Sequence, residues 1–147
     1  MNYSRLESRV CLDEGFRSDA YLDTAGIPTI GYGTTRILDV PVTLTNPIIT
    51  ESVARQLLRQ DLYGACIDAQ ALFTRFDEIN DVRQEVLVNL AYNLGKPRLS
   101  GFTKLLAAAE LLDYAQMAAE MENSRWFAQV GQRGIRLRDA MLIGAWP

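Results

Sequence analysis

Two carboxyl side chains and a hydroxyl near the N-terminus, Glu14, Asp23 and Thr29, are of the types that can perform acid–base chemistry. Leu6, Val10 and Glu14 are spaced by four, which puts the acid on the apolar face of a predicted helix, at its last turn. Asp23 precedes a turn and Thr29 follows it, so pairing of the flanking strands would make them neighbours. A proton-donating acid, a second carboxylate and a hydroxyl that holds water are the groups that glycosidic bond hydrolysis requires.

Each of the three residues also has a structural explanation. Glu14 could be a solvated acid at a helix end, Asp23 a turn-initiating residue, and Thr29 a strand former. The spacing alone leaves both interpretations open.

The elements that would position these residues follow from the surrounding pattern. Ser4 and Glu7 form a capping-box signature for a helix that ends at Gly15. From residue 16 to residue 35, short runs broken by glycines and a proline predict a small antiparallel sheet. Residues 38 to 49, which contain Pro41 and Pro47, are predicted to form a loop.

The rest of the chain has helical periodicity. Thr50 is the predicted N-cap of a long helix over residues 50 to 73, and a further apolar helix over 82 to 94 is closed by Gly95 and Pro97. Additional helices fit residues 102 to 112, 114 to 123 and 133 to 143. No repeat or flexible linker interrupts the sequence, so we expect one domain over residues 1 to 147, of the α+β class and mostly helical.

Composition excludes several kinds of chemistry. The chain contains no histidine, which removes Ser-His-Asp and Cys-His nucleophile systems. Its two cysteines, Cys11 and Cys66, lie in apolar helical patterns and are interpreted as reduced, buried thiols and not as a disulfide. No metal site and no cofactor are therefore expected.

Charge and hydropathy limit the partners. The net charge is −3, but residues 96 to 147 hold 7 basic and 5 acidic side chains, with arginines clustered from Arg125 to Arg138. That cluster suggests a polyanion-binding face, whereas the negative total and the lack of a recognised motif argue against nucleic acid. No segment approaches the roughly 18 apolar residues of a membrane span, and the charged N-terminus argues against a secretory signal. Synthesis in the cytoplasm fits these features.

The motifs DEGFR, AYLDTAG and TIGYG, which contain the three candidate residues, closely resemble the signature of phage-type lysozymes, the endolysin family that includes the T4-like lysozymes of glycoside hydrolase family 24. The resemblance continues through NLAYNLG, SGFTKLL, SRWF and GQRGIRLRDAMLIGAW. It implies a sheet-bearing lobe over about 14 to 50, a connecting helix over about 50 to 75, and a helical lobe formed by 76 to 147 together with helix 1 to 14. The family's substrate lies in a cleft between the lobes.

The resemblance also implies roles for individual residues. Glu14 would be the general acid, Asp23 the carboxylate on the opposite face of the sugar, and Thr29 the residue that orients water. Relatives with this trio are taken to hydrolyse with inversion. Arg133 matches an arginine that pairs with the catalytic glutamate, although it could also be a solvated helix-start residue. Positions that contact saccharide or peptide in the family are matched by Tyr92, Asn93, Phe102 and Arg125. The alternative is core packing for Tyr92 and Phe102, burial against a polar partner for Asn93, and simple surface exposure for Arg125.

The implied function is that of an endolysin, or muramidase, which cleaves the β-1,4 bond between N-acetylmuramic acid and N-acetylglucosamine in bacterial peptidoglycan. We expect a bacteriolytic, antimicrobial monomer that stays in the host cytoplasm until a separate holin releases it to the periplasm and cell wall. The alternatives are a lysozyme-like domain that binds peptidoglycan without cutting it, and a lytic transglycosylase. One departure stands out: many relatives carry histidine after GYG, where this chain has Thr34.

Overall fold

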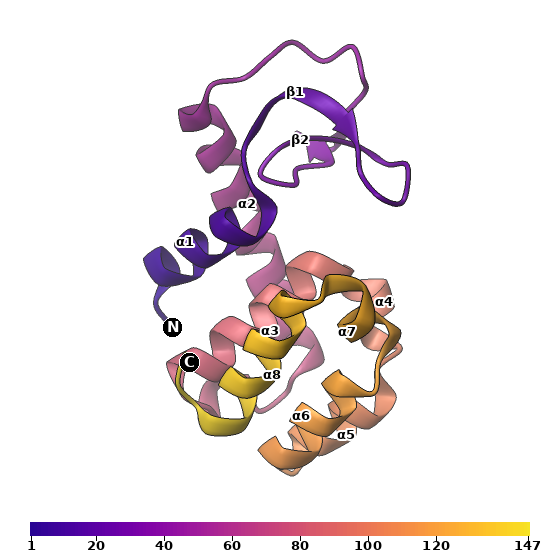
Figure 1. Cartoon of the computed structure of the whole chain (residues 1–147). Coiled ribbons are helices and arrows are strands. Elements are labelled where there is room, and N and C mark those ends of the chain that lie inside the picture. Colours follow the sequence, from indigo (N-terminus) through magenta and orange to yellow (C-terminus); the bar gives the residue numbers. More distant parts are fainter. The chain divides into compact units, whose positions relative to one another are not determined.

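The computed structural model describes all 147 residues, and it confirms the α+β, mostly helical class (Figure 1). The elements in chain order are α1 (Tyr3–Glu14), β1 (Arg17–Leu22), β2 (Pro28–Gly31), β3 (Arg36–Ile37), β4 (Val40–Pro41), α2 (Glu51–Leu72), a 3₁₀ turn (Phe76–Glu78), α3 (Asp81–Leu94), α4 (Lys96–Ser100), α5 (Thr103–Glu110), α6 (Tyr114–Glu122), α7 (Arg125–Val130) and α8 (Gln132–Ile143).

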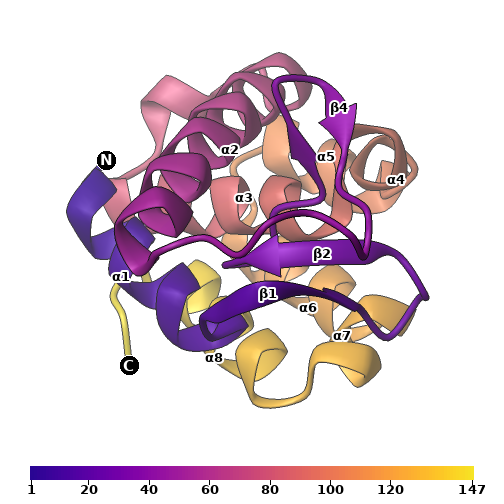
Figure 2. The ribbon, with the colours of Figure 1, turned by 90° about the horizontal axis from the view of Figure 1, so that it is seen from above.

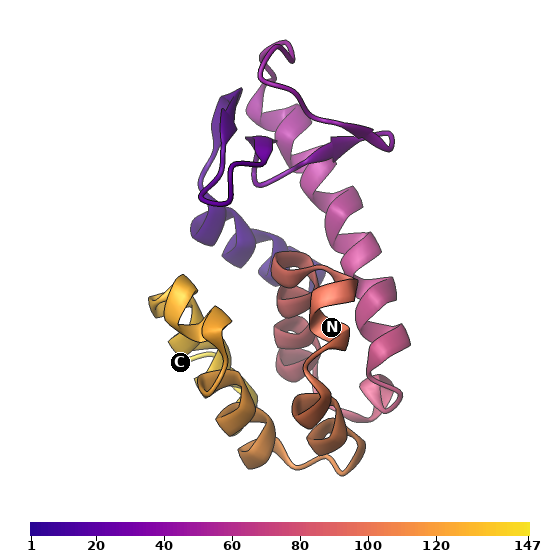
Figure 3. The same ribbon diagram turned by 90° about the vertical axis from the view of Figure 1, so that its right-hand side faces the viewer.

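The chain divides into two compact units. One comprises Ser4–Gly64, and the other comprises Met1–Tyr3 and Ala65–Pro147. The long helix α2 is continuous across the boundary in sequence between them (Figure 3). This division groups nearly all of α1 with the strands, whereas the resemblance grouped helix 1 to 14 with the later helices. The organisation as one domain stays a prediction.

In the unit Ser4–Gly64, β1 and β2 form the predicted antiparallel pair and lie side by side (Figure 2). Tyr21 is opposite Thr29, and Arg17 is opposite Gly31, with an irregularity in the register between the two pairs. Such a bulge bends the strand and increases its twist locally. The hairpin turn between Leu22 and Pro28 contains Asp23.

A second, very short hairpin pairs β3 with β4. The two residues at its turn, Leu38 and Asp39, both have positive φ, at 49° and 63°. This is the backbone that a two-residue hairpin turn with the twist of its strands requires. The prediction of a loop from residue 38 was wrong for Val40–Pro41, because two-residue strands leave no periodicity to detect.

Helix α1 ends where the sequence predicted but begins differently. Gly15, at φ 69°, donates its N–H to the Cys11 carbonyl and stops the helix. The capping-box prediction was wrong, because α1 begins at Tyr3 and Ser4 lies inside it. Glu7 instead binds two arginines of α2, Arg55 and Arg59.

In the helical unit, α3 carries a nearly continuous run of buried residues and contacts α4 and α8. Helix α6 packs on both α5 and α8. The helices predicted over 102 to 112, 114 to 123 and 133 to 143 are confirmed as α5, α6 and α8. Helices α4 and α7, of five and six residues, were not predicted, since neither is long enough to show a repeat. Pro97 lies in the first turn of α4, where a missing N–H costs nothing.

One buried carboxylate holds both chain ends within this unit. Glu85 of α3 is fully buried and accepts hydrogen bonds from the backbone N–H of Asn2, at 3.0 Å, and from Nε1 of Trp146, at 2.9 Å. The N-terminal ammonium also contacts Asp81, at 2.6 Å.

Candidate functional site

Glu14 is the last residue of α1 and is partly exposed. No basic side chain lies in the last turn of this helix. The carboxyl is therefore at the end where the helix dipole offers it no stabilisation. The positive φ of Gly15 turns the chain directly into β1, so the acid and the hairpin are joined by two residues, Gly15 and Phe16.

The two oxygens of Asp23 have different environments. Oδ1 accepts hydrogen bonds from the backbone N–H groups of Ala25, at 2.9 Å, and Ile27, at 2.8 Å. The backbone closes the same turn, because Asp23 N–H donates to Ile27 O and Gly26 N–H donates to Asp23 O. An aspartate that caps its own turn is held in one rotamer. Oδ2 meets no protein donor, which leaves it available to a water or a ligand.

Thr29 lies on β2 and is only 3% exposed. Its hydroxyl donates to the Ile27 carbonyl at 2.9 Å. Because the hydroxyl proton is already used, the remaining lone pairs can only accept, for example from a water O–H. The predicted neighbourhood is confirmed, since Asp23 and Thr29 both bond to Ile27.

Sequence reasoning did not single out Tyr21, which lies opposite Thr29 on the hairpin. It is opposite Thr29 on the paired strand and two residues before Asp23, so the three side chains project from the same face. The guanidinium of Arg17 stacks on the Tyr21 ring, 4.4 Å from its centroid. In the sequence, the spacing of two residues between Tyr21 and Asp23 could have indicated that their side chains lie on the same face.

The pKa of Tyr21 is raised above its ordinary value. Burial is the largest cause of its rise above the ordinary value, followed by the negative charge of Glu14. Arg17 opposes the rise and Asp23 adds to it. Glu14, Tyr21 and Asp23 all belong to the unit Ser4–Gly64.

A chain of polar contacts fixes α1 against α2. Glu7 accepts from Arg59 at 2.9 Å and from Arg55 at 3.2 Å, and these bonds, led by that from Arg59, lower the pKa of Glu7. Arg55 also bonds Glu51, which accepts from the hydroxyl of Tyr32 at 2.8 Å. Burial and this bond raise the pKa of Tyr32 to about 12. The helix that ends in Glu14 is thereby tied to α2 and to the residue that follows β2.

Thr34, which stands in the place of the family histidine, is buried and donates to Oδ2 of Asp61 on α2 at 2.9 Å. Burial raises the pKa of Asp61, and the hydrogen bond from Thr34 only partly offsets it. The neutral hydroxyl of Thr34 thus joins the loop that follows β2 to helix α2.

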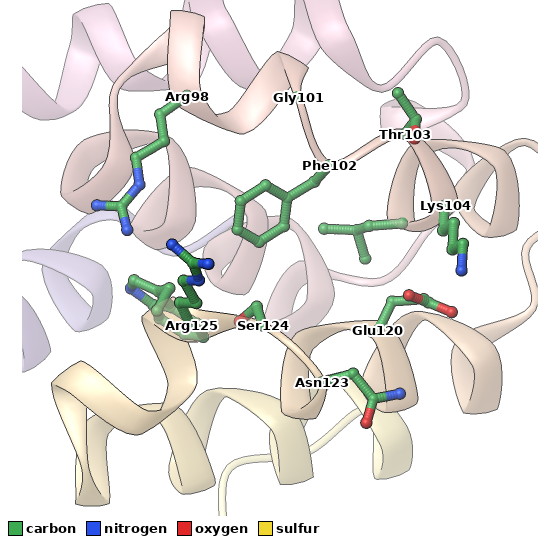
Figure 4. A pocket seen from close by; sticks show the side chains of 11 residues that line it. Arg98, Gly101, Phe102, Thr103, Lys104, Glu120, Asn123, Ser124 and Arg125 are labelled. Atoms are coloured by element: carbon green, nitrogen blue, oxygen red, sulfur yellow. The ribbon is translucent and has the colours of Figure 1, made fainter.

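Two of the predicted substrate-binding residues, Phe102 and Arg125, line a pocket of about 380 Å³ in the helical unit. Figure 4 shows the side chains of Arg98 and Arg125 extending toward each other beside the Phe102 ring. Lys104 adds a third cation, and Glu120 is the one acidic lining residue. The pocket therefore favours an anionic or polar ligand with an apolar portion.

The other two predicted contacts do not line this pocket. Asn93 accepts a hydrogen bond from Nε1 of Trp126 at 2.6 Å, so its amide is engaged in positioning a lining residue. Tyr92 is half-buried on α3. Binding roles for Tyr92 and Asn93 stay predictions.

Arg133 is 9% exposed, and its Nε and Nη2 atoms donate to the Asn89 side chain at 3.2 and 2.8 Å. Its pairing with Glu14 stays a prediction. Arg138 is paired with Asp139, at 2.8 Å, and with Glu122, at 3.1 Å. One arginine of the basic C-terminal cluster, Arg138, is therefore already neutralised within the protein, which weakens the polyanion interpretation.

Other groups offer little alternative chemistry. No cluster of three His, Cys, Asp or Glu residues is arranged to hold a metal ion. Cys11 and Cys66 are free thiols. Cys66 is buried as predicted, whereas Cys11 is only partly buried, and this burial raises the pKa of Cys11. None of the helices has the combination of length and apolar character needed to cross a membrane.

Comparison with known proteins covers nearly the whole chain. The family model described as phage lysozyme matches residues 12–140. The chain is 27% identical over 162 residues to a probable T4-type lysozyme 1 of Dictyostelium discoideum, covering 96% of this chain and 95% of that one. It is 35% identical over 98 residues to the endolysin of Salmonella phage P22, covering 67% and 66%. It is also 27% identical over 153 residues to the pre-baseplate central spike protein Gp5 of Enterobacteria phage T4, covering 90% of this chain and 26% of that one.

Proposed function

Because the chain belongs to the phage lysozyme family, we propose that it hydrolyses the β-1,4 bond between N-acetylmuramic acid and N-acetylglucosamine in bacterial peptidoglycan. Family membership indicates a lysozyme-like function. The bond that is cleaved and the catalytic residues are proposed in addition. The observation that carries it is geometric: only Gly15 and Phe16 separate Glu14 from the hairpin on which Asp23 and Thr29 both bond to Ile27. A pair of carboxyls is the minimum that hydrolysing glycosidases of this kind use.

In the proposed reaction, Glu14 donates its proton to the leaving glycosidic oxygen. Asp23 accepts a proton from water through Oδ2, and Thr29 accepts the second water O–H. The water oxygen attacks the anomeric carbon as the glycosidic bond breaks, so each cleavage adds one water and inverts the configuration. The free Oδ2 of Asp23 supports its assignment as base, and the engaged proton of Thr29 supports its assignment as acceptor.

The remaining parts of the site extend the proposal into the helical unit. Arg133 is proposed to stabilise the ionised form of Glu14 after proton transfer. Phe102 and Arg125 are proposed to bind sugar or peptide portions of the polymer, supported by the pocket that they line. Tyr92 and Asn93 are proposed as further contacts of the same substrate.

The reaction is tested by digesting purified peptidoglycan and weighing the fragments by mass spectrometry. Hydrolysis gives reducing ends, each heavier by one water than the anhydro ends that a transglycosylase leaves. Glu14→Gln is expected to lower kcat by at least about 100-fold, since it removes the proton donor. Asp39→Asn makes a matched carboxyl-to-amide change on the exposed β3–β4 turn and is expected to keep full activity. Anhydro products, or full activity of Glu14→Gln, would refute the assignment.

Stereochemistry is a separate readout. Proton NMR of the first-formed product distinguishes the α-anomer, which inversion predicts, from the β-anomer. A first-formed β-anomer would turn Asp23 from base into nucleophile.

We further propose that the chain acts in host lysis, held in the host cytoplasm until a separate holin opens the inner membrane. The relative named endolysin supports this role. Expression in a bacterial host is expected to clear the culture only after the membrane is permeabilised. Clearing without permeabilisation would contradict the need for a holin.

A further inference from the structure

Tyr21 is half-buried, and its hydroxyl makes no hydrogen bond to another protein group. Tyrosine hydroxyls removed from water normally find a partner, because an unpaired polar group costs free energy. Oδ1 of Asp23 and the Thr29 hydroxyl bond to atoms of their own turn, and Oδ2 of Asp23 is the oxygen proposed to bind the attacking water. The Tyr21 hydroxyl is therefore left for a ligand.

Two contacts fix the position of the ring. Arg17 stacks over one face, 4.4 Å from the centroid, and Thr29 lies directly opposite on β2. Cross-strand neighbours of this kind limit the rotamers that a side chain can adopt. The hydroxyl is thus presented on the face of the hairpin that also carries Asp23.

A hydrogen bond donated by the Tyr21 hydroxyl to the attacking water would make that water a weaker nucleophile. The two protons of that water are directed to Asp23 and Thr29, and its lone pair must reach the anomeric carbon. A donor aimed at the water oxygen would withdraw electron density from the nucleophile. An oxygen of the saccharide is the acceptor that remains.

We propose that Tyr21 is a substrate-contacting residue, whose hydroxyl donates a hydrogen bond to a sugar oxygen beside the bond that is cleaved, while Arg17 holds the ring. This inference rests on the proposed peptidoglycan hydrolysis. The raised pKa of Tyr21 keeps the phenol protonated, and so a donor, throughout the neutral range.

Tyr21→Phe removes only the hydroxyl and keeps the ring under Arg17. Loss of one neutral hydrogen bond to substrate is expected to lower kcat/KM about 10-fold. Tyr63→Phe is the matched control, since Tyr63 is 63% exposed on α2 in the same unit. Steady-state kinetics on soluble peptidoglycan chains and the urea midpoint of unfolding are measured for both. The midpoint of Tyr21→Phe is expected to equal that of the wild type.

Arg17→Gln tests the stacking. It is expected to lower kcat/KM by a smaller factor, and the double variant with Tyr21→Phe is expected to be no worse than Tyr21→Phe alone, because both changes act through one hydroxyl.

Three outcomes would overturn the inference: wild-type kcat/KM in Tyr21→Phe, a loss accompanied by a matching fall in the unfolding midpoint, or full additivity in the double variant. A wild-type chain that does not cleave peptidoglycan would overturn the proposed function itself. Cleavage that depends on Glu14 but not on Tyr21 would overturn only the inference.

Discussion

At the residue scale, the two oxygens of Asp23 have different surroundings, which suit the structural and catalytic tasks proposed for them. Oδ1 closes the hairpin turn through two backbone N–H groups, and Oδ2 faces no protein donor. The geometry of the turn therefore sets the direction of the free oxygen. A rigid carboxylate is what a proton acceptor needs, because misplacement by a fraction of an ångström weakens proton transfer.

This separation predicts different effects of two substitutions. Asp23→Asn keeps an oxygen for both turn hydrogen bonds, so stability is expected to change little while kcat falls by about 100-fold or more. Asp23→Ala also loses the turn bonds and is expected to cost about 1 to 3 kcal/mol of unfolding free energy. Urea denaturation and kinetics measure both. Equal destabilisation by the two variants would contradict the structural task assigned to Oδ1.

Asp61 gives a pH dependence whose sign follows from its surroundings. Its pKa is raised above the ordinary 3.8 in the folded protein, so the folded state binds more protons than the unfolded state just above that pH. The free energy of unfolding therefore falls as pH rises through this window, and the loss is complete above the raised pKa.

Asp61→Asn is expected to remove that loss, because the amide oxygen still accepts from Thr34 but cannot ionise. The variant should gain stability relative to the wild type at pH 7 compared with pH 3.5, as measured by urea unfolding. A stability difference that is the same at both pH values would contradict the argument. Thr34 itself cannot titrate, so it adds no inflection of its own near pH 6.

At the element scale, regular helices were predictable and short elements were not. Helices α2 and α3 show apolar residues at i, i+3 and i+4, and Thr50 caps α2 as predicted, by accepting from the N–H of Val53. The two-residue strands and the five- and six-residue helices α4 and α7 are too short for any period.

The site was predictable where family motifs and local spacing agree. Asp23 and Thr29 lie together because one tight turn joins them. Tyr21 was missed because a tyrosine in a strand is ordinary, and its unusual feature is an unpaired hydroxyl, which only coordinates reveal. Glu7 was assigned to a capping box because its true partners, Arg55 and Arg59, are about fifty residues away.

The bonds of Glu7 predict a stability effect. The Glu7 side chain is 14% exposed, and removal of its charge in Glu7→Gln is expected to cost about 1 to 2 kcal/mol, discounted for the solvent around Arg59. Glu78→Gln removes a carboxylate from an exposed pair with Arg75 and is expected to change stability little. Thermal unfolding compares the two. An effect of Glu7→Gln as small as that of Glu78→Gln would show that these contacts do not hold α1.

Gly31 at the end of β2 combines two constraints. Its φ is 68°, and an added Cβ would lie 3.1 Å from Ala54 Cβ and 3.2 Å from Ile49 Cδ1. Gly31→Ala is expected to destabilise by about 2 to 4 kcal/mol, from backbone strain and overpacking together. Gly26→Ala has the same strain, at φ 77°, with open space around the Cβ, and is expected to cost about 1 to 2 kcal/mol. Equal losses of unfolding free energy in urea would show that the contacts of the added Cβ with Ala54 and Ile49 do not contribute.

At the scale of the whole molecule, the net charge of −3 opposes approach to anionic cell walls. The salt bridges of Arg138 with Asp139 and Glu122 reduce the positive field of the C-terminal segment further. Family membership over residues 12–140 shows that this charge balance is carried on a phage lysozyme chain.

The charge predicts a weak response to salt. Hydrolysis of isolated cell walls is expected to change less than about threefold between 20 and 200 mM NaCl, because little electrostatic attraction exists to be screened. The rate of turbidity clearing at several salt concentrations measures this response. Asp39→Asn and Asp77→Asn each make the net charge less negative and are compared with the wild type. A steep loss of rate with salt in the wild type would contradict the prediction.

Glu85 bonds the backbone of Asn2 with one oxygen and the indole of Trp146 with the other. The first and last residues of the chain are therefore neighbours within one unit. The packing therefore does not require the present order of the elements along the chain. A short linker can join the two ends, and new ends can be opened in the exposed segment between β4 and α2. Such a circular permutant would synthesise α1 and the four strands after α8 instead of before α2, with the same contacts left to form.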